Sequence, residues 1–419
     1  MSPLPSLTSL LAGRSGTPSG LVSGPLSGTL PRARFPRTCA VLEAGVSEGV
    51  APGFVAGLWQ LKAPEEMDII AWGQRRIFAS AEPRPPLLSS LPMLPMLPML
   101  NDTIFDLASV TKVFSTAALA AILIDRGWLS WDTPIAALLP EYPHPQIEVR
   151  HLLSHTAGLV AWQPFWQRLW QQFAPTPLWQ VPIQDRQNAM RDLVFAVVPE
   201  AAPGARCVYS DLSFLILGFA LEELTRLPLD LAVKKWVWEP LGIQGAHYFR
   251  TSAQNLDPRL VPSHGIREEY AATEDCAIRG GILQGQVHDD NCWAMGGFAG
   301  HAGAFGRARD VLQFAKGLFH GFLSKQTLDL MWTRVSEPPG CERTLGWDTP
   351  TGITSSAGTR FSTASVGHLG FTGTSLWIDR EAELAVTLLS NRVHPSRENT
   401  KIKDFRPKFH NAIRLDLGR

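Results

Sequence analysis

The stretch Phe105-Asp106-Leu107-Ala108-Ser109-Val110-Thr111-Lys112 decides how the rest of the chain is interpreted. It places Ser109 three positions before Lys112, at the start of an apolar run over 110–124 that has the length of a helix. Residues three apart share one helix face, so the Lys112 amine would lie beside the Ser109 hydroxyl. A serine hydroxyl becomes a nucleophile only when another group takes its proton. The alternative is a helix N-cap with a solvated lysine.

The composition is that of a globular protein. The chain has 419 residues, of which 45% are hydrophobic and 18% charged, enough for one large or two modest domains. Lys and Arg number 38, as do Asp and Glu, so no basic surface for a nucleic acid is expected. The chain has no Cys-x-x-Cys motif, and its cysteines are widely spaced, which argues against a disulfide framework or a zinc site and favours a reducing compartment. They are Cys39, Cys207, Cys276, Cys292 and Cys341.

Residues 1–37 are rich in Ser, Gly, Pro and Leu without an apolar period, and we expect them to be disordered. They make a poor secretory signal, because no Lys or Arg precedes the short apolar run 7–12. The sequence therefore favours a cytoplasmic location, and a periplasmic one would require a different start codon. The Leu-Pro-Met repeat over 91–100 has too many prolines for a membrane helix, so we expect an extended loop and no transmembrane segment.

Strand-like segments lie near both ends of the chain. Segments 54–61 and 68–72 follow a helix-like stretch over 38–50, and segments 374–379 and 384–389 precede a helix-like stretch over 403–417. The region 113–335 is mostly helix and loop. This pattern predicts an α/β (α+β) fold in which one domain spans 38–419. Its antiparallel sheet is built from both termini and flanked by helices, with a large, mostly helical lobe inserted.

Two further motifs could supply partners for Ser109. In Tyr209-Ser210-Asp211, Tyr209 could act as a base if a cation such as Lys112 lowers its pKa from about 10. The alternative is that Asp211 caps a helix and Tyr209 is a packed aromatic residue. The glycine-rich stretch 367–374 precedes an apolar strand, where glycine allows another backbone to approach closely. The alternative there is an ordinary turn.

Three other clusters have structural explanations that we prefer. His151 and His155 are four positions apart, but no third metal ligand is evident, so a hydrogen-bonded turn is favoured. The stretch His288-Asp289-Asp290-Asn291 is interpreted as a hydrogen-bonded loop at the mouth of the site rather than a metal site. A buried helix face is favoured over a substrate-facing wall for a set of residues at helical spacing. These are Trp162, Phe165, Trp166, Leu169, Trp170 and Phe173.

Taken together, Ser109-x-x-Lys112, Tyr209-Ser210-Asp211 and His368-Leu369-Gly370 resemble three motifs of penicillin-recognising serine hydrolases. Those motifs are Ser-x-x-Lys, Tyr-x-Asn and Lys-Thr-Gly, and they occur in the same order and rough spacing. The resemblance is to the serine β-lactamase and penicillin-binding protein family, in the branch of class C β-lactamases, DD-carboxypeptidases and β-lactamase-like esterases. It covers about 38–419, with further likeness over 151–159, 297–303 and 370–379.

The resemblance implies a role for each matching residue. Ser109 would be the acylated nucleophile, and Lys112 and Tyr209 would move its proton. The main-chain N–H groups of Ser109 and Phe371 would form the oxyanion hole. The substrate-binding positions would be Asp211, His368, Leu369 and Gly370. The substrate would be a small ester, amide or peptide, and the resemblance implies neither a metal nor an organic cofactor.

Three departures from the family pattern bear on the substrate. Leu369 has no hydroxyl to bind a carboxylate, and an ionised Asp211 cannot donate a hydrogen bond. His368 would carry a partial positive charge near neutral pH, so affinity for an anionic substrate would fall as pH rises through its titration. These changes favour an esterase-like activity. A D-alanyl-D-alanine carboxypeptidase or weak β-lactamase, and a non-catalytic binding protein on the same scaffold, are the alternatives.

Overall fold

The computed structural model describes residues 33–77, 96–250 and 267–418. Most of the N-terminal segment and residues 91–95 of the Leu-Pro-Met repeat therefore lie outside the described residues. The last residues of the expected 1–37 segment are described, and helix α1 (Pro36–Ser47) begins within them. At the end of the repeat, β3 (Leu97–Pro98) pairs with β2 (Met67–Arg76).

A six-stranded antiparallel sheet joins the two ends of the chain, which confirms the predicted fold class. Its order is β3-β2-β1-β11-β10-β9. The predicted hairpins are β1 with β2 and β10 with β11, and β1 pairs with β11 in the register Phe54↔Ser390. The remaining bounds are β1 (Gly53–Gln60), β9 (Val366–Leu369), β10 (Ser375–Asp379) and β11 (Leu384–Ser390).

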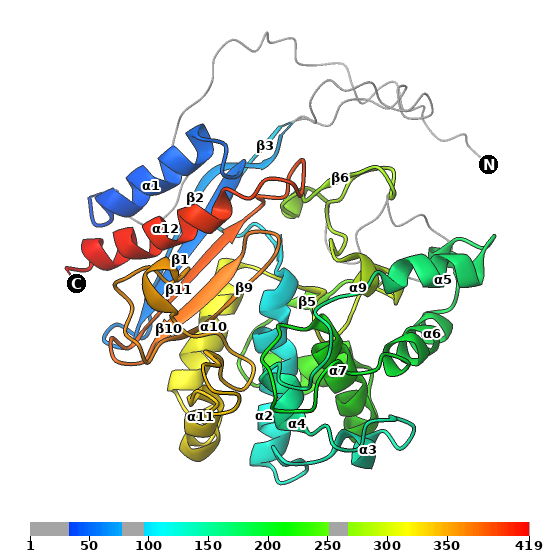
Figure 1. Cartoon of the computed structure of the whole chain (residues 1–419). Coiled ribbons are helices and arrows are strands. Elements are labelled where there is room, and N and C mark those ends of the chain that lie inside the picture. Colours follow the sequence, from blue (N-terminus) through cyan, green and yellow to red (C-terminus); the bar gives the residue numbers. More distant parts are fainter. Residues whose placement is uncertain (1–32, 78–95, 251–266, 419) are drawn as a thin grey trace, which may run out of the picture.

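Both faces of the sheet are covered. All eight residues of β1 are buried, and their side chains alternate between two apolar clusters, Phe54 in one and Val55 in the other. On one face, α1 and α12 (Ile402–Asp416) lie side by side, as Figure 1 shows. The hydroxyl of Thr38 donates to Asp416 Oδ2 at 2.8 Å, which ties these two helices together. On the other face, α10 (Ala308–Phe319) packs against β1 and β11.

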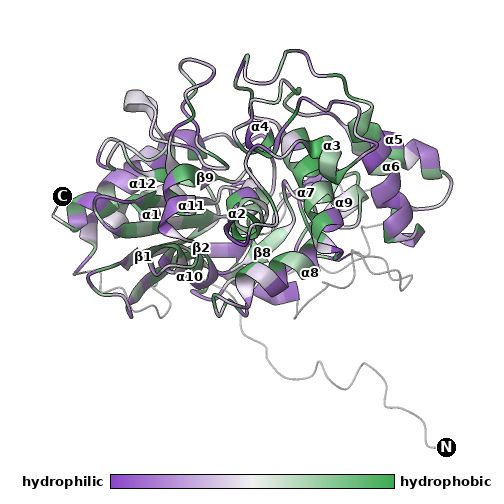
Figure 2. Ribbon diagram, turned by 90° about the horizontal axis from the view of Figure 1, so that it is seen from below, coloured by the Kyte–Doolittle hydropathy of each residue, from purple (hydrophilic) through white to green (hydrophobic). Residues whose placement is uncertain are grey.

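Helices make up most of the lobe on the far side of α10, with apolar residues on their inner faces (Figure 2). Three short strands, β4 (Phe105–Asp106), β8 (Ala304–Gly306) and β5 (His247–Tyr248), form a small sheet within it. Another pair is β6 (Asp275–Cys276) with β7 (Gly281–Ile282). The helices are α2 (Ala118–Asp125), α3 (Ile135–Leu138), α4 (Val149–Leu153), α5 (Phe165–Phe173), α6 (Ile183–Phe195), α7 (Asp211–Thr225), α8 (Leu229–Val233), α9 (Asp290–Ala294) and α11 (Lys325–Trp332).

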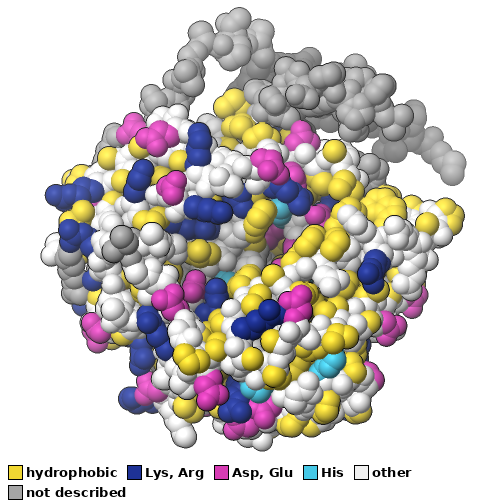
Figure 3. All heavy atoms as spheres, viewed as in Figure 1, with side chains coloured by type: hydrophobic (Ala, Val, Ile, Leu, Met, Phe, Trp, Pro, Cys, Tyr) yellow, Lys and Arg dark blue, Asp and Glu magenta, His cyan; other side chains and the backbone are white. Residues whose placement is uncertain are grey.

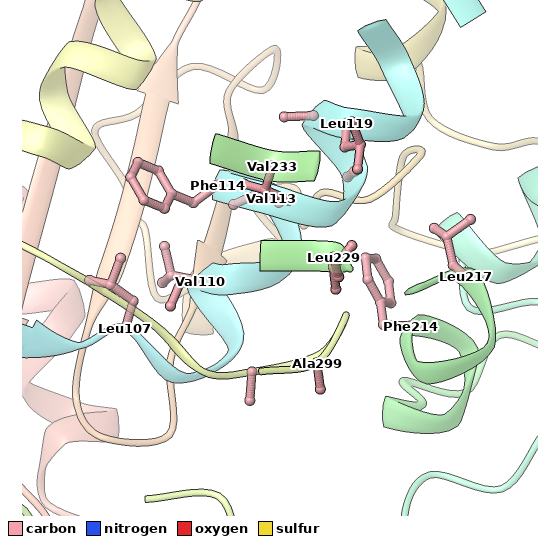
Figure 4. Packing of buried hydrophobic residues seen from close by; sticks show 14 of the residues in the cluster. Leu107, Val110, Val113, Phe114, Leu119, Phe214, Leu217, Leu229, Val233 and Ala299 are labelled. Carbon is pink, nitrogen blue, oxygen red and sulfur yellow. The ribbon is translucent and has the colours of Figure 1, made fainter. Parts of the chain in front are cut away.

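The apolar run after Ser109 is helical but not one regular α-helix. It begins with a 3-10 turn over Ala108–Val110, continues as a π-helical segment over Lys112–Ala117, and becomes α2. Its side chains pack against α7 and α8 in the central core (Figure 4). By length and composition, Ala108–Asp125 is the only described helix that could cross a membrane, and 83% of it is buried within the fold, as expected of a core helix.

Candidate active site

Ser109 lies at a strained turn between β4 and the core helix. Ala108 has a φ of 46°, in the left-handed region that residues with a Cβ seldom adopt. The main-chain N–H of Ala108 donates to Asp106 Oδ1 at 2.8 Å, and Asp106 Oδ2 accepts from the N–H of His288 at 2.6 Å. A buried carboxylate thus stabilises the turn. Strain of this kind costs on the order of 1–3 kcal/mol and is concentrated at functional sites.

Lys112 is completely buried, and its ammonium group has three hydrogen-bond partners. Its Nζ lies 3.0 Å from Ser109 Oγ, 2.7 Å from Asp211 Oδ1 and 3.0 Å from the carbonyl oxygen of His301. Burial alone would lower the pKa of Lys112, but the nearby Asp211 carboxylate and Tyr209 outweigh burial and raise it. Lys112 is therefore a cation at neutral pH, and all three of its protons are directed by the protein.

Tyr209 completes the group around Ser109. Its hydroxyl lies beside Ser109 and Lys112, and both of these groups act to lower its pKa. The ring centroid lies 5.0 Å from Lys112 Nζ, 5.0 Å from Arg343 Cζ and 4.6 Å from the His155 ring. The main chain is fixed next to Tyr209, because the N–H of Ser210 donates to His155 Nδ1 at 3.0 Å. His155 therefore has a structural role, which confirms the hydrogen-bonded turn expected there.

The expected lowering of the Tyr209 pKa is wrong. Burial raises the pKa of this phenol, and the lowering effect of Lys112 does not offset it. Tyr209 is therefore a neutral phenol in the resting site at neutral pH. Its phenolate, once formed, has the Lys112 ammonium beside it.

Asp211 lies at the first turn of α7 and forms an ion pair with Lys112. Ser210, rather than Asp211, is the N-cap of that helix, since its hydroxyl accepts from the N–H of Ser213. The Asp211 carboxylate also lines the cavity described below. One of its oxygens is thus committed to the lysine, which the sequence motif alone did not indicate.

The stretch after β9 approaches the Ser109 turn closely. The hydroxyls of Thr372 and Thr374 donate to the carbonyl oxygens of Asp106 and Leu107 at 2.8 and 2.9 Å. A Cβ on Gly370 would lie 2.6 Å from the Leu107 oxygen and would collide with the Thr374 hydroxyl, so only glycine fits. The neighbouring main-chain N–H of Phe371 donates no hydrogen bond to any residue that the structure describes.

His368 is buried, and its Nδ1 lies 2.9 Å from the carbonyl oxygen of Leu369. Burial lowers the pKa of this imidazole well below its ordinary value, and the Lys112 and Arg343 cations lower it further. The partial positive charge expected on His368 near neutral pH is therefore wrong. The expected pH dependence of anion affinity through His368 loses its basis for the same reason.

Several of these residues line a cavity of about 680 Å³. Figure 3 shows the hollow near the centre of its face, with basic and apolar side chains around it. Trp162 and Phe371 both line it and are 48% and 51% exposed. The buried helix face expected over 162–173 is therefore only partly correct, because Phe165 and Leu169 are buried but Trp170, in α5, and Trp162, before it, are not. The predicted residues in the lining are Ser109, Tyr209, Asp211, His368, Leu369, Gly370 and Phe371.

The cavity also has a basic wall that sequence reasoning missed. It consists of Arg343, Arg392, Arg397, Lys403 and Arg406. No local pattern marks these residues, which come from a loop, the segment after β11 and the start of α12. Arg406 is buried with Nη2 donating to the carbonyls of Gly370 and Thr374, both at 2.8 Å, and burial lowers its pKa to about 9.

The polar cluster at 288–291 is a hydrogen-bonded structure at the cavity wall, as expected. Asp289 caps α9 by accepting from the N–H of Cys292 at 2.7 Å, and it pairs with His301 Nε2 at 2.9 Å. Asp290 forms ion pairs with Arg279 and Arg397. Within the described parts of the chain, no group of three or more His, Cys, Asp or Glu side chains has a metal-binding arrangement.

Comparison with known proteins agrees with this geometry. The Beta-lactamase family model matches residues 94–407, so the chain belongs to the β-lactamase family. It is a serine hydrolase of the β-lactamase fold. A relative from Salmonella agona (strain SL483), named as a D-alanyl-D-alanine carboxypeptidase, is 28% identical over 325 residues, 72% of each chain.

Two solved structures share the fold. EstCE1, described as a hydrolase with promiscuous acyltransferase activity, aligns with a TM-score of 0.64 at 21% identity, over 91% of this chain and 98% of that one. A penicillin binding protein from Bacillus halodurans aligns with a TM-score of 0.60 at 17% identity, over 87% of this chain and 98% of that one. At these identities, the likeness concerns the fold alone.

Proposed function

We propose that the protein hydrolyses esters or amides through an acyl-enzyme on Ser109, with an esterase-like preference. The observation that carries this proposal is the position of Ser109 Oγ, 3.0 Å from Lys112 Nζ and beside Tyr209. A nucleophile within hydrogen-bond reach of its base, with that base beside a fixed cation, is the arrangement that acyl transfer requires.

Tyr209 first releases its own proton to solvent, which gives the phenolate. Ser109 Oγ then attacks the substrate carbonyl carbon and its proton passes to the Tyr209 phenolate. The adjacent Lys112 ammonium stabilises that phenolate before the transfer. The N–H groups of Ser109 and Phe371 stabilise the negative charge that develops on the carbonyl oxygen. The intermediate then collapses, the leaving alcohol takes the proton from Tyr209, and the acyl group stays on Ser109. Water cleaves this ester by the same route in reverse.

The side chains that line the cavity support a preference for esters. Leu369 provides no hydroxyl, His368 is neutral at neutral pH, and Asp211 is paired with Lys112. These three positions therefore do not supply the contacts that a C-terminal acylamide acid would need. Trp162 and Phe371 provide aromatic surface at the rim, which suits an apolar acyl or aryl group.

The basic wall favours a second candidate, a D-alanyl-D-alanine carboxypeptidase. Arg343 lies over the Tyr209 ring, and its nearest acidic partner, Asp348 Oδ1, is 3.8 Å away. A guanidinium in this position could bind a substrate carboxylate that Leu369 does not. The name of the Salmonella relative agrees with this candidate.

One experiment tests the proposal and separates the candidates. Rates would be measured on short-chain aryl esters, a D-Ala-D-Ala peptide and a chromogenic cephalosporin, alongside labelling by a fluorophosphonate probe. Ser109→Ala should reduce turnover by on the order of 10⁴-fold or more and abolish labelling. The exposed Ser47 offers a matched control, because Ser47→Ala removes a hydroxyl that is not part of the cavity lining. Labelling that persists in Ser109→Ala would contradict the assignment. A protein that neither reacts with the probe nor turns over any substrate would be the non-catalytic binding alternative.

A further inference from the structure

Two cysteines from distant parts of the sequence meet beside the cavity. Cys207 precedes Tyr209 by two residues, and Cys341 precedes Arg343 by two residues. Their side chains are hydrogen-bonded to each other. Both are partly exposed, whereas the other three cysteines, at 39, 276 and 292, are buried. The pair therefore combines mutual contact with access for a dissolved oxidant, which the wide spacing of the cysteines in the sequence did not suggest.

The surroundings of the two thiols differ. Cys207 Sγ lies 3.6 Å from the carbonyl oxygen of Ser154. The hydrogen bond from Cys207 lowers the pKa of Cys341 to about 6, and Arg343 lowers it as well, whereas the pKa of Cys207 is raised. At neutral pH the pair thus consists of a thiolate at Cys341 and a thiol at Cys207. A thiolate is the form that reacts with peroxides and disulfides.

We propose that Cys207 and Cys341 form an oxidation site at which a peroxide converts the two thiols into a disulfide. The Cys341 thiolate attacks one peroxide oxygen, the O–O bond breaks, and hydroxide leaves, giving a sulfenic acid. Cys207 sulfur then attacks the Cys341 sulfur, the S–O bond breaks, and the oxygen departs as water. That water carries the proton of Cys207, and the hydroxide released in the first step takes a proton from solvent. One hydrogen peroxide is reduced to two waters, and the two cysteines are oxidised by two electrons.

The disulfide would connect two loops that line the catalytic cavity. Arg343 Cζ lies 5.0 Å from the centroid of the Tyr209 ring. Cys341 is two residues before this arginine, and Cys207 is two residues before this tyrosine. The bond would bring the sulfurs from hydrogen-bond contact to about 2.0 Å and draw the two loops together. Small displacements of catalytic groups reduce rates strongly. This effect on rate rests on the proposed function, whereas formation of the disulfide does not.

The test uses the full chain treated with hydrogen peroxide and digested with trypsin without reduction. Cleavage after Arg206, Arg226, Arg334 and Arg343 gives peptides 207–226 and 335–343, each with one cysteine. We expect a linked species two hydrogens lighter than the sum of the two peptides, which dithiothreitol separates. We also expect ester hydrolysis to fall by about threefold or more and to recover on reduction.

Cys207→Ser and Cys341→Ser are the matched variants. Under reducing conditions each should retain activity within about twofold, and neither should form the linked peptide or lose activity reversibly. Peroxide treatment that leaves both peptides unlinked, or that links either one to a second copy of the chain, would overturn the proposal. If the linked peptide forms but Ser109→Ala leaves ester hydrolysis unchanged, the oxidation site stands and the proposed function fails.

Discussion

The carboxylate of Asp211 lies 2.7 Å from the ammonium nitrogen of Lys112, inside a site where the lysine has no access to solvent. The family pattern has an amide at the position of Asp211. A carboxylate there holds the lysine in its charged form, so Lys112 cannot accept the proton of Ser109. It also disfavours a second negative charge nearby, including the phenolate of Tyr209. This ion pair sets the pH behaviour expected of the protein.

Asp211→Asn should move the pH dependence of activity toward lower pH. In the parent protein, Tyr209 is a base only as a phenolate, so kcat/KM should rise with pH on the alkaline side. The Asp211 carboxylate contributes to raising the pKa of Tyr209, and its removal should lower that pKa. Profiles of kcat/KM on a neutral aryl ester check this. Asp185→Asn on the exposed side of α6 is the control, and an unshifted profile for Asp211→Asn would count against Tyr209 as the base.

Tyr209→Phe should remove proton transfer while preserving the packing of the ring. We expect kcat to fall by on the order of 10²–10⁴-fold, the usual contribution of a positioned acid or base. The melting temperature should change little, because the contacts of the ring with His155 and Lys112 remain. Tyr142→Phe is a matched control, since Tyr142 is also buried and its hydroxyl lacks a partner among the described residues. Full activity in Tyr209→Phe would exclude this role.

Gly370→Ala should push the turn after β9 away from the turn that contains Ser109. The new methyl group would press on the Leu107 carbonyl oxygen, which belongs to the main chain and cannot turn away. We expect a loss of about 1–3 kcal/mol in unfolding free energy and a larger loss in kcat than in affinity. In the control Gly306→Ala, the nearest atom is a Leu107 side-chain carbon at 3.3 Å, which can shift. Equal behaviour of the two variants would argue against a special role for Gly370.

Leu369→Thr should increase reactivity toward penicillins by supplying the hydroxyl that the family motif contains. Leu369→Val has nearly the same shape as the threonine variant without the hydroxyl, so the pair isolates the hydrogen bond. The measurement is the rate at which a fluorescent penicillin labels Ser109. We expect labelling at least about fivefold faster in the threonine variant than in the valine variant. Identical rates would mean that another group, such as Arg343, governs recognition of the carboxylate.

Stability should fall in acid through Glu274. Burial alone would raise its pKa, but hydrogen bonds from His288 and Arg397 lower it from 4.5 to about 2. A carboxylate with a lowered folded pKa contributes stability above about pH 4.5, and this contribution is lost as pH falls toward 2. Glu274→Gln should therefore flatten the dependence of unfolding free energy on pH in this range. Glu48→Gln, on the exposed end of α1, should leave it unchanged.

The sheet was predictable because its hairpins carry their own signals. Alternating or continuous apolar runs on either side of short polar turns predicted two hairpins, β1 with β2 and β10 with β11. One hairpin lies near each end of the chain, which indicated that the two share one sheet. The contact between Ser109 and Lys112 followed from their spacing. That spacing did not reveal the change from 3-10 to π geometry along this run.

The electrostatics of the site could not be predicted in the same way. A pKa depends on burial and on neighbours from other elements, so the directions expected for Tyr209 and His368 were both wrong. The basic wall was missed because Arg343, Arg392 and Arg406 come together only in the folded chain. Their approach to Ser109 depends on β9 and α12, which lie far from it in sequence.

The sheet that joins the two ends of the chain has a consequence for biosynthesis. Ser109 and Lys112 leave the ribosome long before the segment with Gly370 and Phe371 is made, a delay of about tens of seconds at usual rates of translation. The nascent chain at that stage holds a nucleophile without the strand edge that would stabilise an oxyanion. On the proposed mechanism, activity is therefore withheld until synthesis is nearly finished, and a ribosome-bound fragment ending before β9 should fail to react with an acylating probe.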